Sequence, residues 1–290
     1  MLQGVKVIGE EKLTLGGFIA KAQAEGKPLS EIFLAGESEK TGAAREELME
    51  RMRQRAAVMR AALEQGLAVP QCSRSGLIKG AAHQLHDWQE TGASLLCPAF
   101  TRLTARAMAV GEVNACMGKI VAAPTAGSSG VLPAVLFTVA EERGLPEERI
   151  LSALFTAGGI GMVIDSLATL SGARGGCQAE IGSASAMAAG GLVEMMGGLP
   201  AQVGDAVAFA LKNILGLICD PVGGLVEIPC VKRNALGALN AVSAAEIALA
   251  GVTSTFSADQ VIEAMGRVGK GLPEEFRETA RGGLACLTPR

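Results

Sequence analysis

The chain has 290 residues, of which 49% are hydrophobic and only 3% aromatic, and its formal net charge is −3. With this charge and no basic patch interleaved with aromatic residues, we expect no nucleic-acid partner. A core without large rings must be built from Ala, Leu, Val, Ile and Met in close contact with Gly, which favours helices packed on helices over a β-sandwich or a barrel.

The seven cysteines are too sparse for a disulfide scaffold in a chain of this length, and their number is odd. With no signal peptide at the N-terminus, we expect reduced thiols and a cytoplasmic protein. The longest uncharged stretch, residues 120–140, contains two prolines and a run of Gly and Ser that would break a lipid-spanning helix. Other apolar runs, such as residues 150–164, are too short to span, so we expect no membrane contact.

Residues 1–66 are predicted to form an N-terminal helical segment that packs on the main domain. Within it, a helix is expected to start at a Thr41 cap and to stop at Gly66. After Pro70 the charged residues become fewer, and residues 67–290 are predicted to form the catalytic domain with a C-terminal tail. One continuous domain is the alternative.

His83 and His86 are three residues apart, which places both on one face of a predicted helix beside Asp87. The spacing is compatible with an acid–base or metal-binding role. A partly buried helix without chemistry is the more common origin of such a pair. We therefore keep His83 only as a candidate catalytic residue.

Further helices are predicted at residues 100–116, 131–143, 147–157, 184–196, 201–215, 231–250 and 258–268, and no sustained strand pattern is present. The predicted fold is therefore all-α. The joints between these helices are rich in glycine, and we expect the functional residues to lie in them.

The first of these joints, APTAGSSG at residues 123–130, precedes a predicted helix. Its free N–H groups and hydroxyls suit an anion such as a carboxylate, although simple capping by serine explains the pattern equally well. It is not a Walker loop, because no Gly-Lys-Ser/Thr follows. Thr125, Ser128 and Ser129 are candidate substrate-binding residues.

Three cysteines lie at breaks marked by glycine or proline: Cys177, Cys219 and Cys230. Cys230 is expected in the first turn of a helix, where the helix dipole and the neighbouring Lys232 and Arg233 would favour a thiolate. The separations of 42 and 11 residues match no standard zinc or ferredoxin pattern. Spacing alone therefore leaves open whether these thiols bind a metal or are ordinary buried side chains.

Longer blocks of the sequence resemble one family, the alpha subunit or alpha domain of the iron–sulfur-dependent bacterial L-serine dehydratases. The blocks are GEVNACMGKIVAAPTAGSSGVLP (111–133), GGCQAEIGSASAMAA (175–189), LKNILGLICDPVGGLVEIPCVKRNALGALNA (211–241) and RETARGGLA (277–285). The match runs from about residue 41 to residue 285.

The resemblance implies a largely helical fold in which glycine-rich loops surround a [4Fe–4S] cluster held by Cys177, Cys219 and Cys230. Gly175 and Gly176 would let the backbone approach the cluster. Three protein ligands would leave one iron open as a Lewis acid for the elimination of water from L-serine, which yields pyruvate and ammonia.

The resemblance also implies a separate beta subunit, because the chain lacks the other domain of the family. A catalytic base could lie on that subunit; on this chain the candidates are Lys232 and His83. Arg233 and Asn234 join the loop at 123–130 as candidate substrate-binding residues. Relatives often have Gly-Gly-Asp-Ala-x-Lys-Leu near residues 79–85, where Ala81 and Gln84 replace the acid and the lysine.

Cys286 lies in the tail RGGLACLTPR, whose two glycines would let it fold back. It is either a further iron ligand that serine displaces or an idle thiol on a frayed terminus. Two other functions remain open for the whole chain: a related β-eliminating enzyme acting on L-cysteine or L-threonine, and a non-catalytic iron–sulfur sensor or assembly protein.

Overall fold

The computed structural model describes residues 13–289 and confirms the all-α prediction. Over this range the chain forms helices and two isolated β-bridges but no strand. The α-helices are α1 (Leu15–Glu25), α2 (Leu29–Thr41), α3 (Arg45–Ala68), α4 (Ala81–Glu90), α5 (Pro98–Ala115), α6 (Val131–Arg143), α7 (Glu147–Leu167), α8 (Gly172–Gly175), α9 (Ser183–Met195), α10 (Pro200–Lys212), α11 (Cys230–Leu249) and α12 (Ala258–Gly271). Four shorter elements are η1 (Gln178–Gly182), a π-helix, and the 3-10 helices η2 (Val222–Gly224), η3 (Glu274–Phe276) and η4 (Gly283–Cys286).

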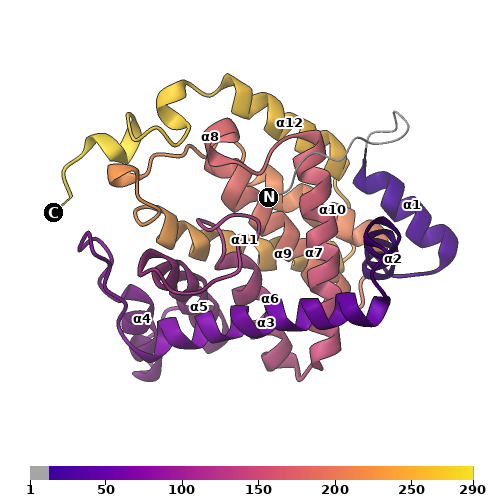
Figure 1. Ribbon diagram of the computed structural model, residues 1–290, viewed down its shortest axis with the longest axis horizontal. Helices are drawn as coiled ribbons and strands as arrows, with labels where there is room; N and C mark the ends of the chain where they lie inside the picture. Colours follow the sequence, from indigo (N-terminus) through magenta and orange to yellow (C-terminus); the bar gives the residue numbers. More distant parts are fainter. Residues whose placement is uncertain (1–12, 290) are drawn as a thin grey trace.

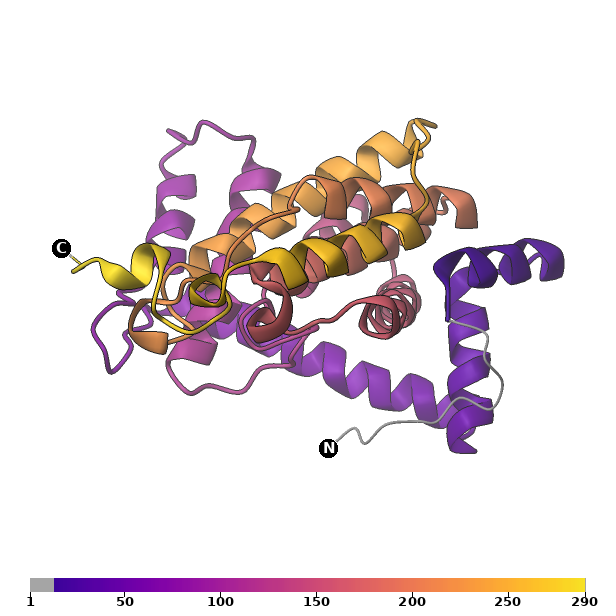
Figure 2. The ribbon, with the colours of Figure 1, turned by 90° about the horizontal axis from the view of Figure 1, so that it is seen from above.

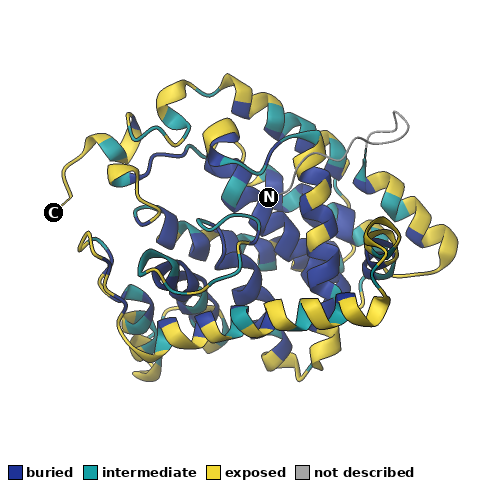
Figure 3. Ribbon diagram, viewed as in Figure 1, coloured by how far each residue is buried: buried dark blue, intermediate teal, exposed yellow. Residues whose placement is uncertain are grey.

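Helix α9 is the centre of the fold. All of its residues are buried, and it packs against α6, α7, α10 and α11. Figure 3 shows buried residues concentrated on these inner helices and exposed residues on the outer ones. The small residues of α9 permit this arrangement: a Cβ on Gly190 would lie 2.3 Å from Ile160 Cδ1, and one on Gly191 would lie 2.8 Å from the Ala153 carbonyl oxygen.

The N-terminal helices pack on this centre. Helix α2 contacts α7, α1 contacts α10, and α3 runs along one edge of the molecule against α5 (Figure 1). Figures 1 and 2 both place α1 and α2 at the opposite end of the molecule from the C-terminus. A single hydrophobic core includes Leu15, Phe33 and Met59 together with Ile160 and Met265. The division at residue 66 stays a prediction.

The expected limits of the helix at 41–66 are wrong. Thr41 is the last residue of α2, where its hydroxyl donates to the Glu37 carbonyl oxygen, and the next helix starts at Arg45 after Ala44. Helix α3 also continues through Gly66 to Ala68. Gly66 is needed for helix contact rather than for termination, because a Cβ there would lie 2.5 Å from the Ala109 carbonyl oxygen of α5.

Helix α7 is longer than predicted, since it runs through Gly158, Gly159 and Gly161 to Leu167. Gly159 lies beneath the Phe33 ring, which a Cβ would approach to 2.3 Å. The apolar run at 150–164 is thus part of a 21-residue helix, one long and apolar enough to cross a membrane. Of the most apolar 18-residue stretch of α7, 67% is buried within the fold, which is typical of a core helix.

Candidate metal centre

Cys177 lies where the short helix α8 joins the central helix. Gly176 has a φ of +76°, and after Cys177 the chain enters the π-helix η1, which leads directly into α9. The Cys177 side chain is 1% exposed. A cysteine in this position is held by the start of a fully buried helix, so its sulfur has a defined location.

Gln178 ties this segment to its neighbours. Its amide nitrogen donates to the carbonyl oxygens of Gly175 and Met265, and its side-chain oxygen accepts from the Gly216 N–H at 2.9 Å. Its own backbone N–H donates to the Leu217 carbonyl oxygen. These bonds fix the Cys177 turn against the loop that leads to Cys219.

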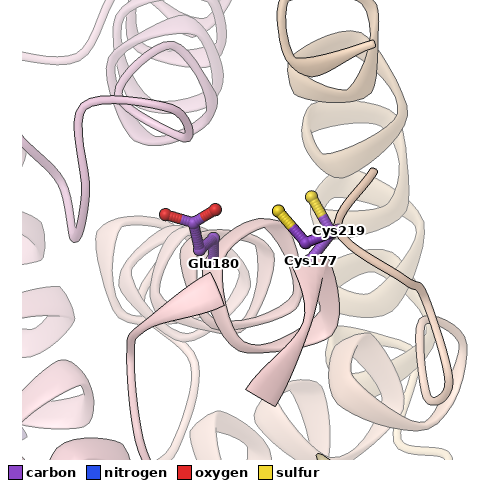
Figure 4. A group of neighbouring side chains, drawn as sticks. All are labelled: Cys177, Glu180 and Cys219. Atoms are coloured by element: carbon purple, nitrogen blue, oxygen red, sulfur yellow. The ribbon is translucent and has the colours of Figure 1, made fainter. Parts of the chain in front are cut away.

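Among the described residues, one group could hold a metal ion: Cys177, Glu180 and Cys219. Their ligand atoms all lie within 4.8 Å of one another. Figure 4 shows the two sulfurs side by side and the Glu180 carboxylate pointing to the same side of the helix. Glu180 is missing from the residues expected from the sequence, although it is the only acid in the block 175–189.

The two sulfurs are close enough to influence each other's ionisation. Interaction with Cys219 lowers the pKa of Cys177 against the opposing effect of burial, and the positive charge of Arg233 lowers it further. Interaction with Cys177, together with burial, raises the pKa of Cys219. The two thiols therefore titrate as a pair.

Cys230 is the first residue of α11 and is 7% exposed. Burial raises the pKa of its thiol to about 12, and the charges of Cys177 and Glu180 act in the same direction. Arg233 acts in the opposite direction and lowers the pKa, as expected from the sequence, but burial is the larger effect. Cys230 lies outside the group that shares the 4.8 Å limit.

Gly172, rather than Gly175 or Gly176, gives the sulfurs room. A Cβ on Gly172 would lie 2.7 Å from Glu180 Oε2 and 3.3 Å from Cys219 Sγ. A Cβ on Gly175 would meet Ala179, and one on Gly176 would meet Leu272 at 2.7 Å. The two glycines before Cys177 allow close packing within the protein, and their expected role beside a cluster stays a prediction.

The loop at 123–130 reaches this centre, since a Cβ on Gly127 would lie 3.8 Å from Glu180 Oε2. Burial raises the pKa of Glu180 to about 7, although Thr125 acts to lower it. The Ser128 hydroxyl lies 3.0 Å from Thr125 Oγ1, and Ser129 donates to the Ala126 carbonyl oxygen within the loop. Both serines are fully buried, whereas Thr125 is partly exposed.

Asn234 and Arg233 hold the surroundings together. Asn234 accepts from the Gly130 N–H and donates to the Gly127 carbonyl oxygen, so it fixes the loop at 123–130 on α11. Arg233 donates to Asp220 Oδ1 and to the Ile218 carbonyl oxygen, each at 2.9 Å, and its charge acts on the Cys177 sulfur. Asp220 is another contributor that was not expected from the sequence.

The other candidates lie apart from this group. Lys232 is exposed at the start of α11. His83 Nδ1 is 2.6 Å from the Leu67 carbonyl oxygen, and its Nε2 is 3.5 Å from Asp87. The exposed Cys286 thiol donates to the Arg281 carbonyl oxygen. Their expected roles stay predictions.

The donor chemistry of the centre fits a thiophilic metal. Three buried cysteine sulfurs come from the ends of helices or from a loop, and thiolates are the ligands that iron–sulfur clusters use in proteins. Gly172 keeps the space beside Cys219 Sγ free of a side chain. The residues therefore fit the [4Fe–4S] cluster that the resemblance implies.

Comparison with known proteins gives consistent matches. The family model described as "Serine dehydratase alpha chain" matches residues 24–285. The probable L-serine dehydratase alpha chain of Bacillus subtilis (strain 168) is 49% identical over 89% of this chain and 86% of that protein. The L-serine dehydratase alpha chain of Peptoniphilus asaccharolyticus is 46% identical over 79% of this chain and 78% of that protein. The L-serine dehydratase of Streptomyces coelicolor is 39% identical over 96% of this chain but only 60% of its own length.

Proposed function

Because the chain belongs to the serine dehydratase alpha chain family, we propose that it is the alpha subunit of a cytoplasmic L-serine dehydratase. The observation that carries the proposal is the buried group of Cys177, Glu180 and Cys219 beside the loop at 123–130. The reaction is the β-elimination of water from L-serine, with pyruvate and ammonia as the products.

Cys177, Cys219 and Cys230 are the proposed ligands of a [4Fe–4S] cluster. When bound, such a cluster would supply an open iron that acts as a Lewis acid on the β-hydroxyl of serine. The chain contributes the closely spaced sulfurs, the positive charge of Arg233 beside Cys177, and the space beside Gly172.

Glu180 and Thr125 are the proposed substrate-facing residues of this chain. The carboxylate lies within 4.8 Å of both sulfurs, and Thr125, which acts to lower the pKa of that carboxylate, is partly exposed. The loop that carries Thr125 is held in place by the side chains of Ser128, Ser129 and Asn234, which bond mainly within the loop and to its backbone. Arg233 is already bonded to Ile218 and Asp220, so we assign it to the cluster rather than to the substrate carboxylate.

A beta subunit is the proposed partner. The longer Streptomyces coelicolor relative aligns with nearly all of this chain and has further sequence beyond it. His83 is close to the Leu67 carbonyl oxygen and to Asp87, and Lys232 is exposed, so we assign the catalytic base to the partner. Cys286 stays a proposed tail ligand, one that would have to leave its bond to Arg281.

The test is anaerobic reconstitution of the chain with iron and sulfide, followed by a pyruvate assay with and without the candidate beta chain. We expect serine-dependent pyruvate only with both chains. Product from L-cysteine or L-threonine but not from L-serine would reassign the substrate. A cluster whose spectrum does not respond to any of the three amino acids would favour a sensor or assembly role.

Single cysteine variants test the ligand set. Cys177→Ala, Cys219→Ala and Cys230→Ala should each lose the iron chromophore, whereas Cys97→Ser should keep it. Cys97 is an exposed N-cap of α5, a position where serine is well suited. Normal iron content in any of the three alanine variants would remove that cysteine from the ligand set.

A further inference from the structure

The Arg233 guanidinium connects two segments beside the metal centre. It is carried by α11, its side chain is 15% exposed, and it donates to the Ile218 carbonyl oxygen and to Asp220 Oδ1. A planar group with several donors in fixed directions suits such a junction better than a single ammonium. Arg233 therefore bonds to both neighbours of Cys219, and its positive charge acts on the sulfur of Cys177.

Asp220 extends this connection to the C-terminal segment. The residue is 3% exposed; its Oδ1 accepts from Arg233, and its Oδ2 accepts from the Leu284 N–H at 2.9 Å. Gly283 has a φ of +62°, and a Cβ there would lie 2.5 Å from Asp220 Oδ2. The close approach of backbone and carboxylate thus requires glycine at this position.

The same segment runs along Cys219. The Cys219 N–H donates to the Phe276 carbonyl oxygen, and the Glu278 N–H donates to the Cys219 carbonyl oxygen. Glu278 and Ala280 have φ values of +61° and +55°, which L-residues other than glycine seldom adopt. Such conformations persist where surrounding contacts determine them, and the bond from the Glu278 N–H to Cys219 is one such contact.

We infer that Asp220 and Arg233 are positioning residues that link docking of the C-terminal segment 276–284 to the Cys177 ligand of the cluster. The cluster part of this inference rests on the proposed function. A positive charge beside a ligating sulfur raises the reduction potential of an iron–sulfur cluster, and residues that contact the ligands orient them. Loss of the carboxylate should release the segment and leave the guanidinium without its anchor.

The first measurement needs no cluster. Hydrogen exchange of the backbone amides at 276–284 is compared between the iron-free natural chain and Asp220→Asn. Because a hydrogen bond to a charged carboxylate is lost, we expect exchange at Leu284 to accelerate about tenfold. Arg281→Met is the matched control: this exposed arginine of the same segment pairs with Glu274. Unchanged exchange at Leu284 in Asp220→Asn would overturn the link to the segment.

The second measurement uses the reconstituted chain. The midpoint potential of the cluster, followed by electron paramagnetic resonance, should move to a more negative value in Arg233→Met, and to a lesser degree in Arg233→Lys and Asp220→Asn. Arg281→Met should match the natural chain. A potential unchanged in both Arg233 variants would overturn the link to Cys177. If Arg233→Met takes up no cluster, the midpoint potential of Arg233→Lys decides the test.

Failure of the proposed function is distinguishable from failure of this inference. If the natural chain takes up no cluster, the proposed function fails, and the exchange comparison still decides whether Asp220 holds the segment. If the natural chain loads normally and the variants match it in both potential and exchange, the inference alone is wrong.

Discussion

Gly172 leaves room beside two of the side chains that could hold a metal ion, Glu180 and Cys219. A Cβ there would displace the Glu180 carboxylate, 2.7 Å away, and would press on Cys219 Sγ. The end of a glutamate side chain can move at little cost, so we expect Gly172→Ala to fold with nearly unchanged stability. The displaced donors should nevertheless reduce iron bound per chain after reconstitution, which an iron assay and the visible spectrum would measure.

Gly158→Ala is the control for this change. Gly158 lies exposed inside α7, and a Cβ there would meet no atom within 4 Å. Alanine should therefore stabilise the helix by about 0.5–1 kcal/mol and leave iron binding unaltered. Full iron loading in Gly172→Ala would show that the space beside Cys219 is not needed.

Glu194 is a buried acid whose ionisation should cost stability. Its carboxylate accepts from the Ser30 N–H and from the Thr156 hydroxyl, and burial still raises its pKa above the usual 4.5. A raised carboxyl pKa in the folded state adds stability below pH 4.5, and this stability is lost as the pH rises through the folded-state value. The folded chain should therefore be less stable with Glu194 ionised than with Glu194 protonated.

The Glu194→Gln variant should lack this pH dependence, because glutamine keeps an acceptor for Ser30 and cannot ionise. The unfolding free energy of the natural chain should therefore fall relative to that of the variant as the pH is raised from about 4.5. Urea unfolding of both proteins from about pH 4.5 to about pH 8 measures the difference. Glu148→Gln, at an exposed position of α7, is the control, and parallel curves for the natural chain and Glu194→Gln would contradict the prediction.

At the residue scale, the sequence draws attention to cysteines, and the structure brings two of them, Cys177 and Cys219, together. Cys177, Cys219 and Cys230 stand out because glycine or proline marks each position and because long blocks resemble a family. Glu180 and Asp220 were not predicted, since each acquires its role from a tertiary contact: Glu180 from Thr125 and the sulfurs, Asp220 from Arg233 and the tail.

At the scale of helices, several N-termini are capped by acids from other helices. The Glu194 carboxylate of α9 accepts from the Ser30 N–H at the start of α2. Glu112 of α5 accepts from the Ala81 and Ala82 N–H groups at the start of α4. Asp259 of α12 accepts from the Leu15 and Gly16 N–H groups of α1. Local capping rules could not predict these starts, because the capping residue lies far away in the chain.

Asp259→Ala should therefore loosen α1. Two N–H groups would lose their acceptors, and loss of an N-cap costs about 1 kcal/mol. Hydrogen exchange of the amides at 15–25 should become faster, and the unfolding free energy should fall by a similar amount. In both measurements Asp259→Asn, which retains one acceptor, should lie between the natural chain and Asp259→Ala. Equal protection of α1 in Asp259→Ala would mean that packing alone holds the helix.

Glycine-rich stretches were the least reliable guide to helix ends. The glycines after residue 157 were interpreted as a joint, whereas they lie inside α7 beneath Phe33. The limits of α6, by contrast, were predicted correctly, since Gly130 and Gly144 flank the helix in the sequence as in the structure. A glycine that ends a helix and one that admits a neighbouring side chain look alike until the partner is known.

At the scale of the whole molecule, one core joins the N-terminal helices to the rest. Phe33 of α2 is 6% exposed, packs over Gly159 of α7 and lies with its ring 4.7 Å from that of Phe18. The same core extends through Ile160 to Met265 of α12. A disturbance at Phe33 should therefore be felt by the entire chain and not only by residues 1–66.

Phe33→Ala should destabilise the chain by about 3–5 kcal/mol, because a large buried ring is removed and a cavity remains. We expect a single unfolding transition that shifts to lower denaturant while keeping its slope, since shared core contacts make the unit cooperative. Phe256→Ala, at a ring that is 55% exposed, should change little. Circular dichroism during urea unfolding measures both variants. Two separate transitions in Phe33→Ala, with only the first one shifted, would instead show that residues 1–66 unfold independently of the catalytic part.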